Sequence, residues 1–277
     1  MKKAILLLYL SFIMPSLVSA QSAIEIQTLG TGEPILFLPG FATPGEIWEE
    51  TSLQLPDHQS LLVTYAGFGD VAPVDFPWYE KVKTDLIHYI SSENLQNLTL
   101  VGHSMGGNLA IDLAAEFPER VKKVMIVDAL ACMREMMMPG VLAEALGYES
   151  PYNDQLLAMD KAAQNSYLSQ MSQGMISDPV DQQQVQQWME IADRKTFVYG
   201  YVDLLKLDSR PLLPEIKVPV MILVADQPFG SKALINMEKQ YEGLKNKEFA
   251  LAKESKHYIM LDQPEWFMSQ LKSFLSK

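Results

Sequence analysis

The sequence is poor in cysteine and in basic residues, and each deficit excludes a feature or a class of protein. A single cysteine, Cys132, stands among 277 residues, so no internal disulfide can form. Lys and Arg number 22 against 34 Asp and Glu, which gives a formal net charge of −12. A nucleic-acid-binding protein needs clustered Lys and Arg, so that class is excluded. The sequence also lacks a glycine-rich dinucleotide loop and any His, Cys or carboxylate cluster at metal-ligand spacing, so we expect no cofactor and no metal.

A long apolar run is missing everywhere except in the first twenty residues. Lys2 and Lys3 precede an almost wholly apolar stretch, residues 4–18, and residues 18–20 (Val-Ser-Ala) form a cleavage signature. This order is typical of a secretory signal peptide, and the run is shorter than the roughly 20 residues that a transmembrane helix needs. We therefore expect residues 1–20 to be removed, leaving residues 21–277 as a periplasmic or secreted protein without stable membrane insertion. Loss of the two lysines changes the formal charge from −12 to −14.

After the leader, short apolar runs alternate with amphipathic segments. Two segments, residues 78–90 and 264–275, carry apolar residues at helical spacing. Strand and helix in alternation predict an α/β fold with a mostly parallel sheet and helices on both faces. The runs that have the continuous hydrophobicity of buried strands are residues 35–38, 61–64, 98–101, 124–127 and 220–224.

Residues 130–210 interrupt this alternation. No buried-strand run occurs there, and helical patterns rich in Met, Gln, Ala and Leu fill segments such as 155–171 and 181–197. About eighty residues are too many for an ordinary connection between two strands, so we predict an inserted helical cap. The methionines of this segment either line a pliable apolar pocket or pack the cap helices against one another. They are Met133, Met136, Met137, Met138, Met159, Met171 and Met175.

A nucleophile motif follows the third apolar run. Residues 102–107 read Gly-His-Ser-Met-Gly-Gly and lie between the run 98–101 and a helical segment, residues 108–117. G-x-S-x-G at a strand–turn–helix junction marks a nucleophilic serine on a sharp turn, where side chains in place of the glycines would clash. The N-terminus of the helix favours negative charge that develops beside this serine. We therefore predict that Ser104 is a nucleophile.

A serine hydroxyl is a weak nucleophile and needs a base within hydrogen-bond reach. Of the four histidines, His58 precedes a strand, His88 lies on a helix, and His103 lies inside the turn and points away from Ser104. His257 occupies a loop before the last helix, and a serine followed by a histidine near the C-terminus is the chain order of α/β-hydrolases. His257 is therefore the predicted base.

These motifs resemble the α/β-hydrolase superfamily, in particular its capped esterase and epoxide-hydrolase-like branch. Residues 38–41 (Leu-Pro-Gly-Phe) and 257–265 (His-Tyr-Ile-Met-Leu-Asp-Gln-Pro-Glu) add to the likeness, which extends over essentially the whole chain after the leader. The resemblance implies an oxyanion hole formed by the backbone N–H groups of Phe41 and Met105.

Two loops differ from the family pattern. Pro39 stands where the family usually has His, and residues 64–69 (Thr-Tyr-Ala-Gly-Phe-Gly) lack the Asp and the Arg of the usual Asp-x-Arg-Gly-x-Gly. The backbone donor at Phe41 survives the first change. We expect the hydrogen bonds that pack these two loops to differ from those of the family.

The acid of the triad stays open between two aspartates. Asp226 follows the run 220–224, where the family usually has its acid, but the usual position lies two residues further on and holds Pro228. Asp128 ends the run 124–127, which is the place of the acid in some members. Either aspartate can instead cap a loop. We favour Asp128 slightly.

The residues together predict an exported serine hydrolase that acts through an acyl-enzyme on a carboxylic ester with a small or medium acyl group. Ser104 stands where epoxide hydrolases and dehalogenases require Asp, which disfavours those reactions. A lactonase, an aminopeptidase and a carbon–carbon bond hydrolase stay open. So does a different class, a catalytically silent hydrolase fold that binds a small molecule. Arg134 and Arg194 in the cap are candidates for contacting an acidic substrate, although a solvated surface is the simpler interpretation.

Overall fold

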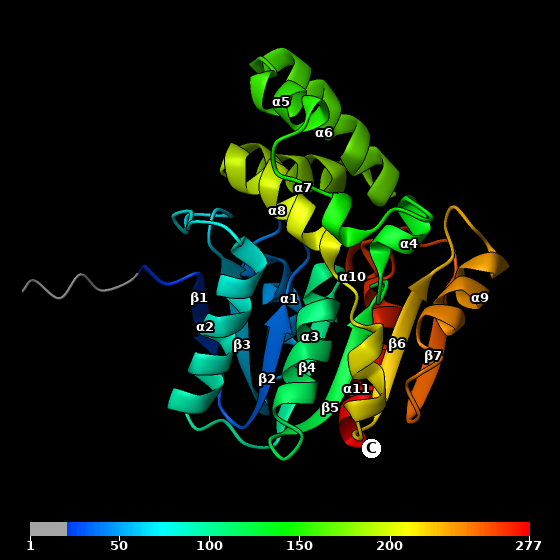
Figure 1. Ribbon diagram of the computed structural model, residues 1–277. Coiled ribbons are helices and arrows are strands. Elements are labelled where there is room, and N and C mark those ends of the chain that lie inside the picture. Colours follow the sequence, from blue (N-terminus) through cyan, green and yellow to red (C-terminus); the bar gives the residue numbers. More distant parts are fainter. Residues whose placement is uncertain (1–20) are drawn as a thin grey trace, which may run out of the picture.

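A seven-stranded sheet forms the centre of the computed structural model, which describes residues 21–277; the predicted leader lies outside the described residues. The strand order is β1-β3-β2-β4-β5-β6-β7, and only β1 runs antiparallel to its neighbour (Figure 1). This confirms the predicted mostly parallel sheet. The strands are β1 (Ile24–Leu29), β2 (Glu33–Leu38), β3 (His58–Tyr65), β4 (Leu98–His103), β5 (Val121–Val127), β6 (Val220–Ala225) and β7 (Lys247–Ala252).

Helices cover both faces of the sheet. On one face lie α2 (Trp78–Ser92) and α3 (Met105–Glu116), and on the other lies α11 (Pro264–Ser276) (Figure 1). Every residue of β4 and β6 is buried, as expected for strands that are covered on both sides. Behind the sheet, Trp48 packs on Phe267 of α11 with ring centroids 5.9 Å apart. The remaining helices of this part are α1 (Glu49–Leu53), α9 (Ser231–Gln240) and α10 (Ile259–Asp262), with 3-10 turns η1 (Gly45–Trp48) and η3 (Arg210–Glu215).

The segment between β5 and β6 is helical and lies above the carboxyl ends of the strands (Figure 1). It contains α4 (Met133–Met137), η2 (Ala143–Ala145), α5 (Pro151–Ala158), α6 (Lys161–Met175), α7 (Pro179–Ile191) and α8 (Arg194–Lys206). We call residues 133–206 the cap.

Two of the helical patterns read from the sequence have the wrong bounds. Residues 155–171 include the end of α5 and most of α6, and residues 181–197 include most of α7 and the start of α8. The chain breaks within each pattern because the side chains of Asp160 and Asp193 accept backbone N–H groups and begin a new helix. Helical spacing alone does not reveal such a break, since the apolar residues continue on both sides of it. No helix among residues 21–277 is both long and apolar enough to cross a membrane.

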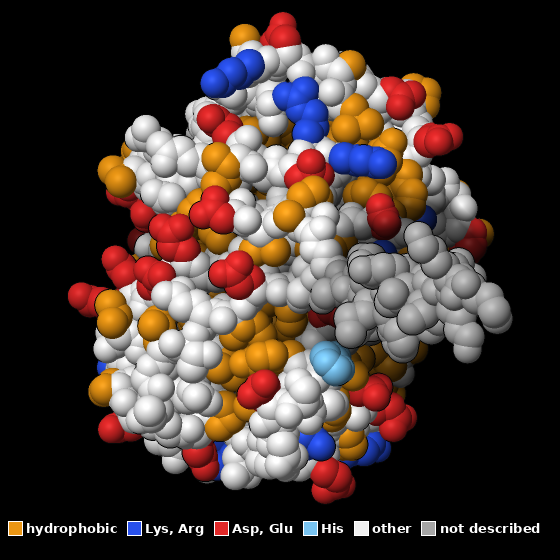
Figure 2. Space-filling model, turned by 90° about the vertical axis from the view of Figure 1, so that its left-hand side faces the viewer, with side chains coloured by type: hydrophobic (Ala, Val, Ile, Leu, Met, Phe, Trp, Pro, Cys, Tyr) orange, Lys and Arg blue, Asp and Glu red, His pale blue; other side chains and the backbone are white. Residues whose placement is uncertain are grey.

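Acidic side chains are spread over the face shown in Figure 2, which fits the formal net charge of −12. Hydrophobic side chains are also exposed on this face, at the height of the sheet and with acidic side chains around them (Figure 2). The net negative charge therefore disfavours the approach of anions at low ionic strength.

Candidate active site

Ser104 lies at the sharp turn between β4 and α3. Its backbone has φ 52° and ψ −124°, a conformation that costs free energy in a residue other than glycine. The neighbouring glycines make this turn sterically possible. A Cβ atom on Gly102 would lie 2.2 Å from the carbonyl oxygen of Gly106, and one on Gly106 would lie 2.1 Å from that of Leu38. The turn therefore packs too closely on its own backbone and on the end of β2 to accept a side chain at either glycine.

The sheet register brings Asp128 beside this turn. His103, the last residue of β4, pairs with Val127, the last residue of β5. The residues that follow, Ser104 and Asp128, therefore leave the sheet side by side, and the backbone N–H of Ser104 donates to the carbonyl of Val127 at 2.9 Å. Asp128 also has a positive φ, 46°, which directs the chain sharply away from β5.

His257 lies in the loop after β7, and its ring is held by Asp128. The distance from His257 Nδ1 to Asp128 Oδ2 is 2.7 Å. The other carboxylate oxygen, Oδ1, accepts the backbone N–H of Ala225 at 3.0 Å. With Nδ1 donating to the carboxylate, Nε2 of His257 is the nitrogen that has a lone pair to accept a proton. Ser104 and His257 both line one cavity of about 400 Å³.

The structure does not bring Asp226 to the histidine. Its Oδ1 is buried and has no hydrogen-bond partner among the described residues, and its backbone N–H donates to the carbonyl of Ala252. Of the two acids left open by the sequence, Asp128 is the one that contacts His257.

The loop after β2 lies against Ser104. A Cβ atom on Gly40 would come within 3.3 Å of Ser104 Cβ and 2.8 Å of His103 Nδ1. The next residue, Phe41, packs its ring edge-to-face on Phe68, with centroids 5.0 Å apart, which fixes this loop. Met105 is the first residue of α3, and backbone N–H groups of a first helical turn have no partner within the helix. The assignment of Phe41 and Met105 as the oxyanion hole stays a prediction.

Other hydrogen bonds hold the two loops that differ from the family pattern. The hydroxyl of Tyr65 donates to the carbonyl of Pro39 at 3.1 Å. The hydroxyl oxygen of Thr64 accepts the backbone N–H of Gly45 at 2.9 Å. The indole N–H of Trp78 donates to the carbonyl of Ala66 at 2.8 Å. Hydroxyl and indole groups thus supply contacts in the segments that lack the usual charged residues.

His103 points away from Ser104, and the structure shows where its ring lies. The imidazole is buried, with its centroid 4.6 Å from the ring of His257 and 4.6 Å from that of Tyr258. Its Nε2 lies 3.1 Å from the carbonyl oxygen of His257, to which it donates. Burial, together with the neighbouring His257, lowers the pKa of His103 well below its ordinary value, so the ring is neutral.

A second connection joins the histidine loop to the loop after β2. The hydroxyl groups of Tyr258 and Thr43 are 2.9 Å apart, and Thr43 donates to the carbonyl of Phe41 at 3.3 Å. Burial raises the pKa of Tyr258 to about 12. The supporting positions of His103, Thr43 and Tyr258 have no signal in the sequence, because no spacing rule connects residues so far apart in the chain.

The cap is attached directly to the histidine loop. Lys256 Nζ donates to the carbonyls of Gln173 and Ile176, at 2.6 and 3.0 Å, at the C-terminal end of α6. Asp262 accepts the backbone N–H of Ser177 at 2.8 Å and that of Lys256 at 2.7 Å. The two residues therefore tie the end of α6 to the loop that carries His257.

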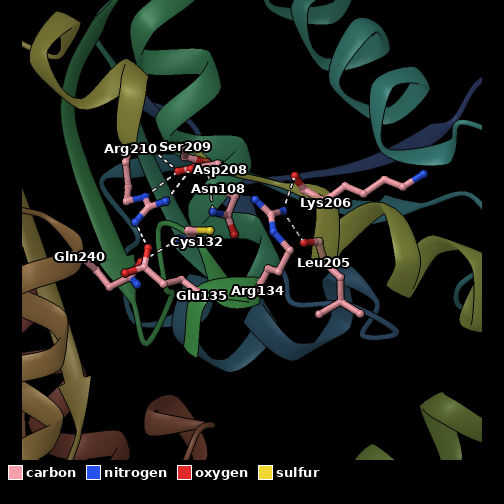
Figure 3. Close-up of polar contacts among 10 residues, drawn as sticks. All are labelled: Asn108, Cys132, Arg134, Glu135, Leu205, Lys206, Asp208, Ser209, Arg210 and Gln240. Atoms are coloured by element: carbon pink, nitrogen blue, oxygen red, sulfur yellow. Dashed lines mark hydrogen bonds and ion pairs between the residues drawn. The ribbon is translucent and has the colours of Figure 1, made fainter. Parts of the chain in front are cut away.

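A polar network joins the cap to the sheet domain at its other end (Figure 3). Arg134 donates to the carbonyls of Leu205 and Lys206, at 2.8 and 2.9 Å, at the end of α8. Arg210 forms ion pairs with Asp208 and Glu135. Arg134 therefore satisfies backbone carbonyls at the C-terminal end of α8, rather than being exposed to a substrate.

Cys132 and Asn108 belong to the same network (Figure 3). The backbone N–H of Cys132 donates to the side chain of Gln240 at 2.7 Å, and Asn108 Nδ2 donates to Leu130 O and Ser209 Oγ, each at 3.1 Å. Burial raises the pKa of the Cys132 thiol, which opposes a role as nucleophile. Among residues 21–277 no group of three or more His, Cys, Asp or Glu is arranged to hold a metal ion.

Comparison with known proteins identifies the family. The model described as "Alpha/beta hydrolase family" matches residues 35–270, so the chain belongs to that family. It is 24% identical over 256 residues to pimeloyl-[acyl-carrier protein] methyl ester esterase of Legionella pneumophila (strain Corby), covering 91% of this chain and 99% of the relative. A putative esterase/lipase of Haemophilus influenzae is 24% identical over 209 residues, 72% of this chain and 67% of the relative.

Solved structures show the same fold. An esterase from Exiguobacterium antarcticum has a TM-score of 0.75 at 23% sequence identity, covering 92% of this chain and 96% of that one. An enol-lactonase from Burkholderia xenovorans LB400 has a TM-score of 0.75 at 14% identity, with the same coverage. The predicted resemblance is confirmed, and the relatives are esterases and other hydrolases of this family.

Proposed function

We propose that the protein is a carboxylic-ester hydrolase that acts through an acyl-enzyme on a small or medium acyl group. The observation that carries this proposal is the hydrogen bond of 2.7 Å between His257 and Asp128, in a loop that lines one cavity with Ser104. A serine on a strand–helix turn, a histidine and a histidine-orienting carboxylate are the three groups that acyl transfer requires. Curated relatives named as ester hydrolases favour an ester over other acyl substrates.

The reaction follows from the roles of these groups. Asp128 accepts the Nδ1–H of His257 and so keeps Nε2 free to take the proton of Ser104. The hydroxyl oxygen attacks the ester carbonyl, and the negative charge on the carbonyl oxygen is stabilised by the backbone N–H groups of Phe41 and Met105. His257 returns the proton to the leaving alcohol. Water then attacks the acyl-enzyme by the same steps and releases the carboxylic acid.

We also propose that the protein is exported to the periplasm or beyond. The support is the order of basic head, apolar stretch and cleavage signature in residues 1–20. N-terminal sequencing of the protein from its native host would find Gln21 as the first residue. A chain that keeps Met1 and stays in the cytosol would refute this proposal.

A fluorophosphonate probe and a panel of p-nitrophenyl esters test the hydrolase proposal. We expect labelling at Ser104, and we expect Ser104→Ala to abolish both labelling and hydrolysis. Ser91→Ala is the matched control, because Ser91 is exposed on α2, and this variant should keep both. An unlabelled wild-type protein without hydrolytic activity would instead favour the silent, small-molecule-binding alternative.

A further inference from the structure

We propose that the cavity beside Ser104 is an acyl-binding site for uncharged hydrophobic acyl groups, and that it excludes acyl groups that carry a carboxylate. This inference rests on the proposed function and names its substrate class. The cavity measures about 400 Å³ and is formed by the sheet domain and the cap together. Its lining includes six methionines: Met105, Met133, Met136, Met137, Met175 and Met237.

The methionines make the cavity apolar and adaptable. Four of the six belong to the cap, so the cap contributes to the pocket wall, whereas Met138, Met159 and Met171 are not part of the lining. The unbranched, flexible thioether side chain adjusts to ligands of different shape. A hydrocarbon chain that leaves water for this cavity gains about 0.8 kcal/mol for each buried CH₂, which corresponds to about fourfold in kcat/KM.

The cavity offers no positive charge to a carboxylate. Among the described residues, its lining contains no Lys or Arg, and its one acidic side chain is Asp128. The two oxygens of Asp128 already accept from His257 and Ala225. A carboxylate on the acyl chain would lose its hydration without gaining a cation, and it would lie near a second negative charge.

Three basic side chains of the cap and of the histidine loop donate to backbone carbonyls. Arg134 donates to backbone carbonyls at the end of α8 (Figure 3), and Arg194 donates to the carbonyls of Leu157 and Met159 within the cap. Lys256 donates to carbonyls at the end of α6. These three cations thus serve the structure of the cap, which leaves none of them for the substrate.

Matched esters test the selection. We would measure kcat/KM of the protein for p-nitrophenyl hexanoate, for the p-nitrophenyl monoester of adipic acid, and for the mixed p-nitrophenyl methyl diester of adipic acid. The monoester and the diester share the same acyl chain and differ in one negative charge. We expect the monoester to be hydrolysed at least roughly 100-fold less efficiently than both neutral esters.

A charge placed at the cavity should reverse part of this preference. Met137 lines the cavity and its residue surface is 62% exposed, so Met137→Lys can add a cation without disturbing the core. Leu142→Lys is the control, because Leu142 is 69% exposed and does not line the cavity. We expect Met137→Lys to shift the monoester-to-diester ratio of kcat/KM at least about tenfold towards the monoester, and Leu142→Lys to leave the ratio unchanged.

The outcomes separate the two proposals. Equal hydrolysis of the monoester and the diester by the wild-type protein overturns the acyl-site inference and leaves the ester-hydrolase proposal standing. An identical shift from both lysine variants also overturns it, since the effect would then come from overall charge. Hydrolysis of none of the esters, with no labelling of Ser104, overturns the proposed function and the inference together. If Met137→Lys does not fold, the comparison of the three esters still decides.

Discussion

Replacing Asp128 by Asn should reduce kcat by about 10⁴-fold with little change in KM. The carboxylate accepts two donors, one on each oxygen: His257 Nδ1–H at 2.7 Å and the backbone N–H of Ala225 at 3.0 Å. Asn has one acceptor oxygen and one NH₂ group, so it cannot serve both donors. When its oxygen stays on the Ala225 N–H, its NH₂ faces Nδ1 and forces the proton of His257 onto Nε2. The ring then presents a donor to Ser104 and cannot take its proton.

The opposite orientation of the amide in Asp128→Asn would leave the Ala225 N–H facing an NH₂ group. An unsatisfied donor of this kind costs about 1–3 kcal/mol, so the orientation that inactivates His257 is preferred. The assay is steady-state hydrolysis of a p-nitrophenyl ester, with the melting temperature as the check on folding. Asp226→Asn is the matched control and should keep kcat within a few-fold, because Asp226 makes no contact with His257. A variant pair with the opposite result, inactive Asp226→Asn and active Asp128→Asn, would refute this reasoning.

Three further variants test the surroundings of the proposed triad. Gly40→Ala places a Cβ 2.8 Å from His103 Nδ1 and 3.3 Å from Ser104 Cβ; we expect kcat to fall about 100-fold, and unchanged kinetics would contradict the packing. Lys256→Met removes two hydrogen bonds to α6 and should lower the unfolding free energy by about 1 kcal/mol in urea titrations, whereas Lys253→Met, on an exposed turn, should not. Burial lowers the pKa of His103 well below 6.5. Below about pH 6.5 the unfolded chain therefore binds a proton that the folded chain does not. The free energy of unfolding should then decrease by about 1.4 kcal/mol for each unit by which the pH is lowered. His103→Gln should remove this slope from unfolding free energies measured between about pH 7 and 5; an identical slope in both proteins would show that His103 titrates normally.

The sheet was predictable because its central strands are buried on both faces. A strand such as β4 has no alternation of polar and apolar residues, and continuous apolar runs of this length are uncommon elsewhere in the chain. β1 was missed because it has no such run: it lies at the edge of the sheet, and its residues are half-buried or exposed. Ser104 and His257 could be selected as candidates from the sequence because each lies in a local motif.

The sequence favours Asp128 over Asp226 only slightly, because the distinction between them depends on contacts between loops. Asp128 and Asp226 both follow a buried strand, β5 and β6, and these strands are neighbours in the sheet. What separates them is which side chain turns toward the loop after β7. The side chain of His257 in that loop contacts Asp128. Beside Asp226 the contact is between backbone groups, because the N–H of Gln227 donates to the carbonyl of Ser255. Contacts between loops of this kind have no periodic signature.

The residues of the site come from two parts of the chain, the sheet domain and the cap, which tolerate substitution differently. Ser104 and Asp128 are fixed by the register of β4 and β5, where a shift of one residue would turn both side chains away from the cavity. The cap side of the cavity is formed instead mainly by α4 and the end of α6, whose methionines can be exchanged with less effect on folding. His257 belongs to both parts, because its loop contacts Asp128 in the sheet domain and the end of α6 through Lys256. A displacement of the cap would therefore affect the proposed base as well as the proposed acyl site, so cap substitutions that alter acyl preference should change kcat together with KM.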